Sequence, residues 1–225
     1  MESSPFPKTR AILFDLDGTL LDTLEDLGRS TNTILAKEGF SSHTLPTFKQ
    51  FVGEGITMLV RRSVPKEISG DEAAIGRLVS ALHQEYSAHC MDATHVYAGI
   101  SELIAGLVKR RIALAVFSNK PDDMVKMLVS HFFPQISFFA VMGASEKLPR
   151  KPDPAGALLI AKKLNISPEN FIFLGDSKTD METATAAGMY AVGALWGFRD
   201  AGELLAFGAK QVVKRPEELL LLVDK

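Results

Sequence analysis

Residues 11–20 read AILFDLDGTL. The stretch opens with four apolar residues and stops abruptly at Asp15. A run that is apolar on both faces is typical of a strand covered on both sides, as in a parallel sheet. A second carboxylate, Asp17, follows two residues later and precedes Gly18, which allows a sharp turn. We therefore expect a buried strand that delivers two acidic side chains at its carboxyl end.

Further apolar runs predict the rest of the sheet. They cover residues 112–117, 138–142, 171–174 and 189–195, with 211–213 as a short edge strand. Helical patterns separate most of these runs, at residues 100–110, 121–131, 154–164 and 178–187. Strands that alternate with helices predict an α/β fold with a doubly wound parallel sheet.

The pattern changes between the first and second strands. Apolar residues recur there at helical spacing, no strand pattern is evident, and Gly53-Glu54-Gly55 interrupts the helices. We predict a small helical domain at residues 23–95, inserted into a core domain formed by residues 8–22 and 96–225.

Composition limits the classes of function. The chain has 225 residues, a formal net charge of -2 and no run of 18 apolar residues, so we expect neither a nucleic-acid nor a membrane partner. Its one cysteine, Cys90, excludes a disulfide framework, and the first ten residues do not resemble a signal peptide. We expect a cytoplasmic protein, either a monomer or a homodimer.

Polar residues follow several of the predicted strands, where parallel sheets bind their ligands. Ser118-Asn119 follows the second strand, Lys151 lies beyond the third, and Asp176 follows the fourth with Asp180 close behind. Clustered carboxylates need a cation between them, and a set of oxygen ligands without His or Cys favours Mg²⁺. A lysine and a hydroxyl suit phosphate oxygens, while carboxylates can act as a nucleophile and as an acid/base.

These residues resemble the four motifs of the haloacid dehalogenase-like phosphatase superfamily, over nearly the whole chain beyond residue 10. The matching segments are DLDGTL at residues 15–20, SNK at 118–120, RKPDP at 150–154 and GDSKTD at 175–180. Within the superfamily the chain looks most like phosphoglycolate phosphatases, through Gly18-Thr19-Leu20, the FVGEG segment at 51–55 and WGF at 196–198. The resemblance implies a Rossmann-like core and a helical cap that closes over the site.

The resemblance also implies a role for each motif residue. Asp15 is expected as nucleophile and metal ligand, and Asp17 as general acid/base with its backbone carbonyl on Mg²⁺. Asp176 is expected as the third metal ligand, with Asp180 behind it, reaching Lys151 or a metal-bound water. Contacts to phosphate and substrate are expected from Ser118, Asn119, Lys151, Gly18, Thr19, Gly53, Glu54 and Gly55. Glu54 would repel an anionic substrate unless it pairs with Arg61 or Arg62 or accepts hydrogen bonds from hydroxyl groups.

The sequence predicts an Mg²⁺-dependent phosphatase that hydrolyses a small phosphorylated metabolite through an aspartyl phosphate, with phosphoglycolate as a model. A phosphosugar mutase of the β-phosphoglucomutase type, a pyrophosphatase and a 5′-nucleotidase share the scaffold and remain alternatives. Gly18-Thr19 favours hydrolysis, because the mutase relatives tend to have Gly-Val there. A dehalogenase has no need for Asp17. A receiver-like regulatory domain, the non-enzymatic alternative, is about half this length.

Overall fold

A computed structural model describes residues 8–223. Residues 1–7, part of the stretch expected to contain no signal peptide, lie outside this range. The centre of the molecule is a six-stranded parallel sheet with the strand order β5-β4-β1-β6-β7-β8. Its strands are β1 (Ala11–Phe14), β4 (Ala113–Pro121), β5 (Ala140–Ala144), β6 (Phe171–Gly175), β7 (Tyr190–Ala194) and β8 (Gln211–Val213). The predicted doubly wound α/β fold is confirmed.

β1 lies in the middle of the sheet, between β4 and β6, and all four of its side chains are therefore buried. Ile12 and Phe14 join the apolar cluster on one face, while Ala11 and Leu13 join the cluster on the other. This alternation follows from the two-residue period of a strand. β1 pairs with β4 and β6 in parallel, so the carboxyl ends of the three strands lie together.

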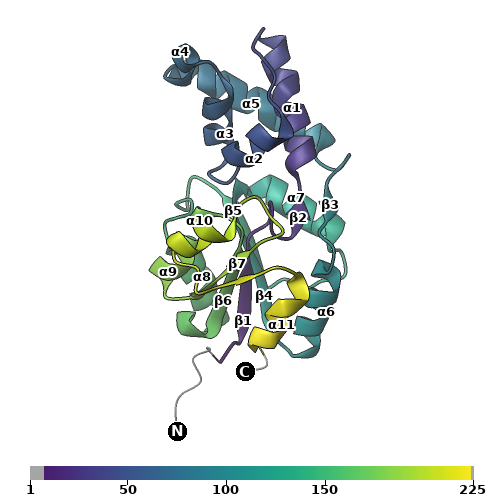
Figure 1. The fold of residues 1–225 in the computed structure, drawn as a ribbon, viewed down its shortest axis with the longest axis vertical. Helices are drawn as coiled ribbons and strands as arrows, with labels where there is room; N and C mark the ends of the chain where they lie inside the picture. Colours follow the sequence, from purple (N-terminus) through teal and green to yellow (C-terminus); the bar gives the residue numbers. More distant parts are fainter. Residues whose placement is uncertain (1–7, 224–225) are drawn as a thin grey trace.

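Helices cover both faces of the sheet (Figure 1). The face with Ile12 packs against α6 (Ile100–Lys109), α7 (Asp122–Phe132) and α11 (Leu220–Val223). The opposite face packs against α8 (Ala155–Leu164), α9 (Lys178–Ala187) and α10 (Ala201–Ala206). Two 3₁₀ turns, η1 (Pro168–Asn170) and η2 (Pro216–Leu219), complete the connections. No helix among residues 8–223 combines the length and apolarity needed to cross a bilayer.

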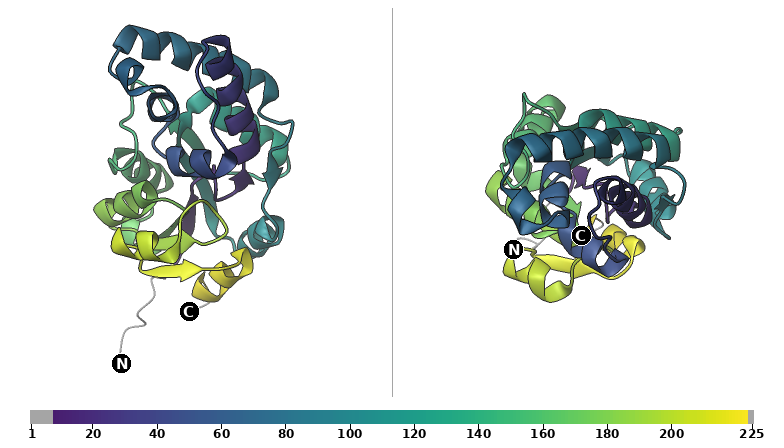
Figure 2. Two further views of the ribbon diagram at one scale, coloured as in Figure 1. Left: turned by 45° about the horizontal axis from the view of Figure 1, so that its top comes forward. Right: turned by 90° about the horizontal axis from the view of Figure 1, so that it is seen from above.

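The inserted helices lie together beyond the carboxyl ends of the strands (Figures 1 and 2). They are α1 (Leu24–Lys37), α2 (Leu45–Phe51), α3 (Ile56–Ser63), α4 (Lys66–Ser69) and α5 (Glu72–His89). α1 and α5 pack against each other, and buried leucine and isoleucine side chains of both helices, among them Leu27 and Leu82, belong to one apolar cluster. The proposed domain limits at residues 23 and 95 remain a prediction.

Three expectations about strands need correction. A two-stranded antiparallel ribbon, β2 (Leu21–Asp22) with β3 (His95–Val96), joins the helices to the core, although no strand was expected there. Two-residue strands have no periodicity to detect. β4 continues past residue 117 to Pro121, because pairing with β5 resumes at Pro121, opposite Ala144, after an irregularity that spans the buried polar residues 118–120. β5 begins at Ala140 rather than at residue 138 and ends in the small residues Gly143 and Ala144.

Arg199, in the loop after β7, connects the core to the inserted helices. Its guanidinium donates to the carbonyl oxygens of Lys49, Gln50 and Val52, at the carboxyl end of α2. The last carbonyls of a helix lack partners within the helix and carry partial negative charge, so a guanidinium suits them. Arg199 therefore fixes α2 over the edge of the sheet.

We expect Arg199→Ala to release the end of α2. Hydrogen bonds to a charged group contribute about 1.5–3 kcal/mol each, so the loss should be measurable. Hydrogen–deuterium exchange should become faster at the amides of residues 49–55 and stay unchanged in β1. Arg215→Ala, which removes an exposed arginine paired with Glu217 and Glu218, is the control. Equal exchange in the two variants would contradict this role.

Candidate active site

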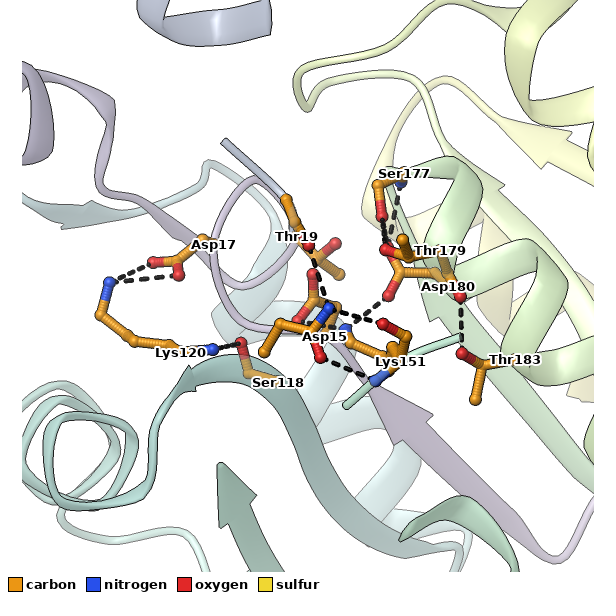
Figure 3. Close-up of polar contacts among 12 residues, drawn as sticks. Asp15, Asp17, Thr19, Ser118, Lys120, Lys151, Ser177, Thr179, Asp180 and Thr183 are labelled. Carbon is orange, nitrogen blue, oxygen red and sulfur yellow. Dashed lines mark hydrogen bonds and ion pairs between the residues drawn. The ribbon is translucent and has the colours of Figure 1, made fainter. Parts of the chain in front are cut away.

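The predicted polar residues meet at the carboxyl ends of β1, β4 and β6. Asp15 directly follows β1, Ser118 and Asn119 lie near the carboxyl end of β4, and Asp176 follows β6. Lys151 comes from the loop before α8, and all these side chains are buried. Figure 3 shows polar contacts of Asp15, Ser118 and Lys151 with their neighbours.

Lys151 joins two of the acidic residues. Its Nζ lies 2.8 Å from Asp15 Oδ1 and 2.5 Å from Asp180 Oδ1. Burial alone would lower the pKa of Lys151, but the two carboxylates raise it above its ordinary value. The other oxygen of Asp180 accepts hydrogen bonds from Ser177 Oγ at 2.5 Å and Ser177 N at 3.0 Å. Asp180 is thus held on both sides by the protein itself.

Asp176 is fixed from two directions. Its Oδ1 accepts a hydrogen bond from the Thr19 hydroxyl at 3.3 Å, and its Oδ2 accepts one from the backbone N–H of Phe198 at 2.7 Å. A Cβ on Gly18 would lie 2.2 Å from Asp176 Oδ2, and Gly18 has a φ of +83°. Glycine is therefore required at residue 18 for both space and backbone conformation.

The acidic cluster has the composition of a site for a hard divalent cation. Carboxylate oxygens of Asp15, Asp176 and Asp180 lie within 4.8 Å of one another. Three ionised carboxylates beside one ammonium, that of Lys151, would leave two negative charges, which a divalent ion offsets. Asp15, Asp176 and Asp180 are the side chains that could hold it, and Asp180 has the most protein donors of its own, Lys151 and Ser177.

The crowding and burial of these carboxyl groups raise the pKa values of Asp15 and Asp176. Burial, joined by the charge of Asp180, raises the pKa of Asp15 to about 7, although Lys151 acts in the opposite direction. Burial, Asp180 and Asp15 raise the pKa of Asp176 well above its usual value. These shifts describe the protein without a cation, and a bound cation would favour the ionised forms.

Asp17 points away from this cluster, toward Lys120 (Figure 3). Lys120 Nζ lies 2.9 Å and 3.1 Å from the two oxygens of Asp17, and the Thr23 hydroxyl donates to Asp17 Oδ1 at 2.7 Å. Asp15 and Asp17 both line a cavity between the strand ends and the inserted helices. Two carboxylates therefore reach the same space in different surroundings.

Only some residues of the loop between α2 and α3 face the cavity. Gly53 and Gly55 line the cavity, whereas Glu54 does not. Glu54 pairs with Arg62 at 2.5 Å, which removes the repulsion expected for an unpaired acid. The amide of Asn119 donates to the carbonyl oxygens of Gly53 and Lys151 and accepts from Lys151 N. Asn119 is thus a brace between the strand, the Lys151 loop and the α2–α3 loop.

Sequence reasoning missed two buried residues of the cavity, Lys120 and Tyr86. Lys120 belongs to the quoted segment at 118–120 but was given no role. The signal available was its place directly after Ser118-Asn119, at the end of an apolar run. Tyr86 lies on α5, and nothing in its local sequence indicates that it faces the strand ends.

Comparisons with known proteins agree with this geometry. The family model for haloacid dehalogenase-like hydrolases matches residues 12–194. A phosphoglycolate phosphatase from Pseudomonas putida is 32% identical over 197 residues, covering 86% of this chain and 72% of that protein. A phosphoglycolate phosphatase from Nitrosospira multiformis is 28% identical and covers 98% of both chains.

A solved structure shows the same arrangement. It comes from Lactobacillus delbrueckii subsp. bulgaricus and is provisionally assigned as a phosphoglycolate phosphatase. It superposes with a TM-score of 0.88 at 29% identity, covering 95% of this chain and 98% of the other. The similarity therefore includes both the sheet and the inserted helices.

We expect Gly18→Ala to damage the acidic cluster, because the new methyl group would collide with Asp176. Gly39→Ala is a matched control, since Gly39 also has a positive φ, +74°, but nothing lies within 4 Å of its Cβ position. The control should lose about 1 kcal/mol of unfolding free energy from backbone strain alone. Gly18→Ala should lose more and should also lose Mg²⁺-induced stabilisation, measured by thermal unfolding with and without the ion. Equal effects would contradict the steric argument.

The raised pKa of Asp15 predicts a pH-dependent stability. Its folded pKa of about 7 lies above the ordinary aspartate pKa of 3.8, so stability present at low pH is lost as the pH rises toward 7 in the cation-free protein. Asp15→Asn removes this loss. In EDTA its unfolding free energy relative to wild type should therefore increase between about pH 4 and pH 7, by at most ~1.4 kcal/mol per pH unit. Urea unfolding of both proteins at several pH values measures the difference, which a constant gap would contradict.

Proposed function

This chain belongs to the haloacid dehalogenase-like hydrolases and is a phosphatase of that family, and we propose that it hydrolyses a small phosphate monoester with Mg²⁺ through an aspartyl phosphate on Asp15. One observation carries the proposal. Asp15 and Asp17 reach one cavity, but Asp15 lies beside Lys151 and Asp176 whereas Asp17 lies beside Lys120 and Thr23. Two carboxylates in different environments suit two different roles.

In the first step an oxygen of Asp15 attacks the phosphorus atom, and the bond from phosphorus to the alcohol oxygen breaks. Asp17 gives its proton to that oxygen, so the alcohol leaves neutral. In the second step a water attacks the phosphorus of the aspartyl phosphate. Asp17 takes the proton of this water, the bond between phosphorus and Asp15 breaks, and inorganic phosphate forms. Both carboxyl groups return to their starting states.

The surrounding residues are proposed to hold the phosphoryl group. Lys151 supplies a positive charge next to the attacking oxygen, and the hydroxyl of Ser118 lines the same cavity. Mg²⁺, when bound by Asp15, Asp176 and the backbone carbonyl of Asp17, would neutralise charge on the phosphate oxygens. The matched relatives support these assignments through their shared family.

Helices α1–α5 are proposed to act as a cap that excludes water. Gly53, Gly55 and Tyr86 from these helices and their loop line the cavity together with the core residues. A closed cap strengthens every electrostatic interaction with the phosphate and protects the aspartyl phosphate. Two of the relatives named above are phosphoglycolate phosphatases, which makes phosphoglycolate the first ester to test.

We expect Mg²⁺-dependent phosphate release from a panel of phosphoglycolate, sugar phosphates, nucleoside monophosphates and pyrophosphate, and none in EDTA. Asp15→Asn should lower kcat by at least about 10³-fold, since the amide oxygen cannot replace the nucleophile. Asp92→Asn, at an exposed carboxylate that pairs with Arg29, should retain activity. Near-normal turnover by Asp15→Asn would exclude the covalent route, and steady release in EDTA would exclude the metal.

A further inference from the structure

Two buried lysines lie in the site, each beside a different carboxylate (Figure 3). Lys151 contacts Asp15, the proposed nucleophile. Lys120 lies near the carboxyl end of β4 and contacts Asp17, the proposed proton donor to the leaving oxygen. Burying an ammonium is costly unless it is paired. The reaction proposed above uses Lys151 but assigns no task to Lys120.

The contacts of Lys120 fix the direction in which the Asp17 carboxyl group faces. Its Nζ lies 2.9 Å and 3.1 Å from the two carboxyl oxygens, and the Thr23 hydroxyl donates to one of them at 2.7 Å. The last torsion of an aspartate side chain varies broadly, so the carboxyl group rotates easily unless it is held. One cation in contact with both oxygens restricts that rotation. A proton donor needs this restriction, because a small misplacement from the reacting oxygen slows proton transfer.

Lys120 is itself held by the cap. Its Nζ lies 4.5 Å from the centre of the Tyr86 ring, and Tyr86 is buried on α5. An ammonium over the face of an aromatic ring is attracted by the electron density of the ring. Burial acts to lower the pKa of Lys120, but Asp17 and Tyr86 raise it above its ordinary value, so the ammonium keeps its charge. A long flexible side chain can orient Asp17 only where its own position is fixed, and the ring contributes to this.

We propose that Lys120 is a positioning residue that orients the carboxyl group of Asp17 toward the leaving oxygen, and that Tyr86 makes this orientation depend on the cap. The inference rests on the proposed function and adds roles for two residues to it. Lys120 acts through Asp17 rather than on the substrate. Its removal therefore slows proton donation by Asp17 more than it slows attack by Asp15.

The choice of leaving group separates these two effects. An alkyl alcohol is a poor leaving group and needs a proton from Asp17, whereas 4-nitrophenolate is a stable anion and leaves without one. The test measures kcat/KM for 2-hydroxyethyl phosphate and for 4-nitrophenyl phosphate with Mg²⁺. This constant reports the steps up to loss of the alcohol, before water attacks the aspartyl phosphate. Neither alcohol carries a carboxylate, so direct attraction of the leaving group to Lys120 does not enter.

We expect Lys120→Met to lower kcat/KM for 2-hydroxyethyl phosphate by at least about tenfold, part of the roughly 10²–10⁴-fold that a positioned acid contributes. The loss for 4-nitrophenyl phosphate should stay below about threefold. Tyr86→Leu, which removes the ring, should give the same pattern with a smaller loss, and Tyr86→Phe should keep the wild-type ratio of the two esters. Lys126→Met, at an exposed lysine paired with Asp122, is the matched control and should change neither constant.

A double variant tests whether Lys120 acts through Asp17. Asp17→Asn alone should already remove most of the activity on 2-hydroxyethyl phosphate, because the amide cannot donate the proton in the same way. Adding Lys120→Met to Asp17→Asn should then lower kcat/KM by less than about twofold more, because residues that act as one unit are not additive.

Several results would overturn the positioning role and leave the phosphatase proposal standing. They are equal losses on the two esters in Lys120→Met, a full further loss in the double variant, or a wild type that hydrolyses 4-nitrophenyl phosphate but no alkyl ester. Lys120→Gln removes the charge and keeps an N–H donor, so it repeats the comparison where Lys120→Met fails to fold, and an unchanged ratio there would also reject the role. Phosphate release from no ester by wild type would reject the proposed function and this inference with it.

Discussion

The shared ammonium of Lys151 is the interaction on which the site depends. It lies between Asp15 and Asp180 in a buried setting, where two unpaired carboxylates would strongly repel each other. The loop that carries Lys151 is fixed by Asn119, whose amide bonds to both backbone groups of that residue. Asp180 is fixed in turn by Ser177 at the start of α9. The ammonium of Lys151 therefore fixes the positions of its own loop, of the end of β1 and of the start of α9 relative to one another.

Local sequence was sufficient to predict burial and element boundaries wherever a residue's environment depends on its own strand or helix. The burial of β1 and the turn at Asp15 follow from residues 11–20, and α9 begins and ends where its pattern indicates, at Lys178 and Ala187. The six-stranded parallel sheet was predictable for the same reason, since each central strand has an apolar run of its own. The convergence of Asp15, Ser118 and Asp176 then follows from topology, because parallel strands end at one edge.

What the sequence did not predict depends on contacts between distant segments. Lys120 was given no role in the sequence analysis, yet it reaches Asp17, 103 residues away. Arg199 binds carbonyl oxygens of α2 that are about 150 residues earlier in the chain, and Tyr86 meets the core only because α5 crosses the strand ends. Glu54 illustrates the same limit, since either arginine was an acceptable partner until the fold selected Arg62. Patterns within one element contain no information about such partners.

The ribbon formed by β2 and β3 has a mechanical consequence. Both connections to the inserted helices run side by side there, with Leu21 opposite Val96 and Asp22 opposite His95, and Tyr97 N donates to the carbonyl oxygen of Leu20. A paired two-chain joint resists twisting more than a single strand does, so it favours bending about one axis. The chain also leaves and re-enters the core domain at neighbouring points. Segments inserted in this way can be lengthened or exchanged without disturbing the layers below, which lets evolution vary the lid while the catalytic edge stays the same.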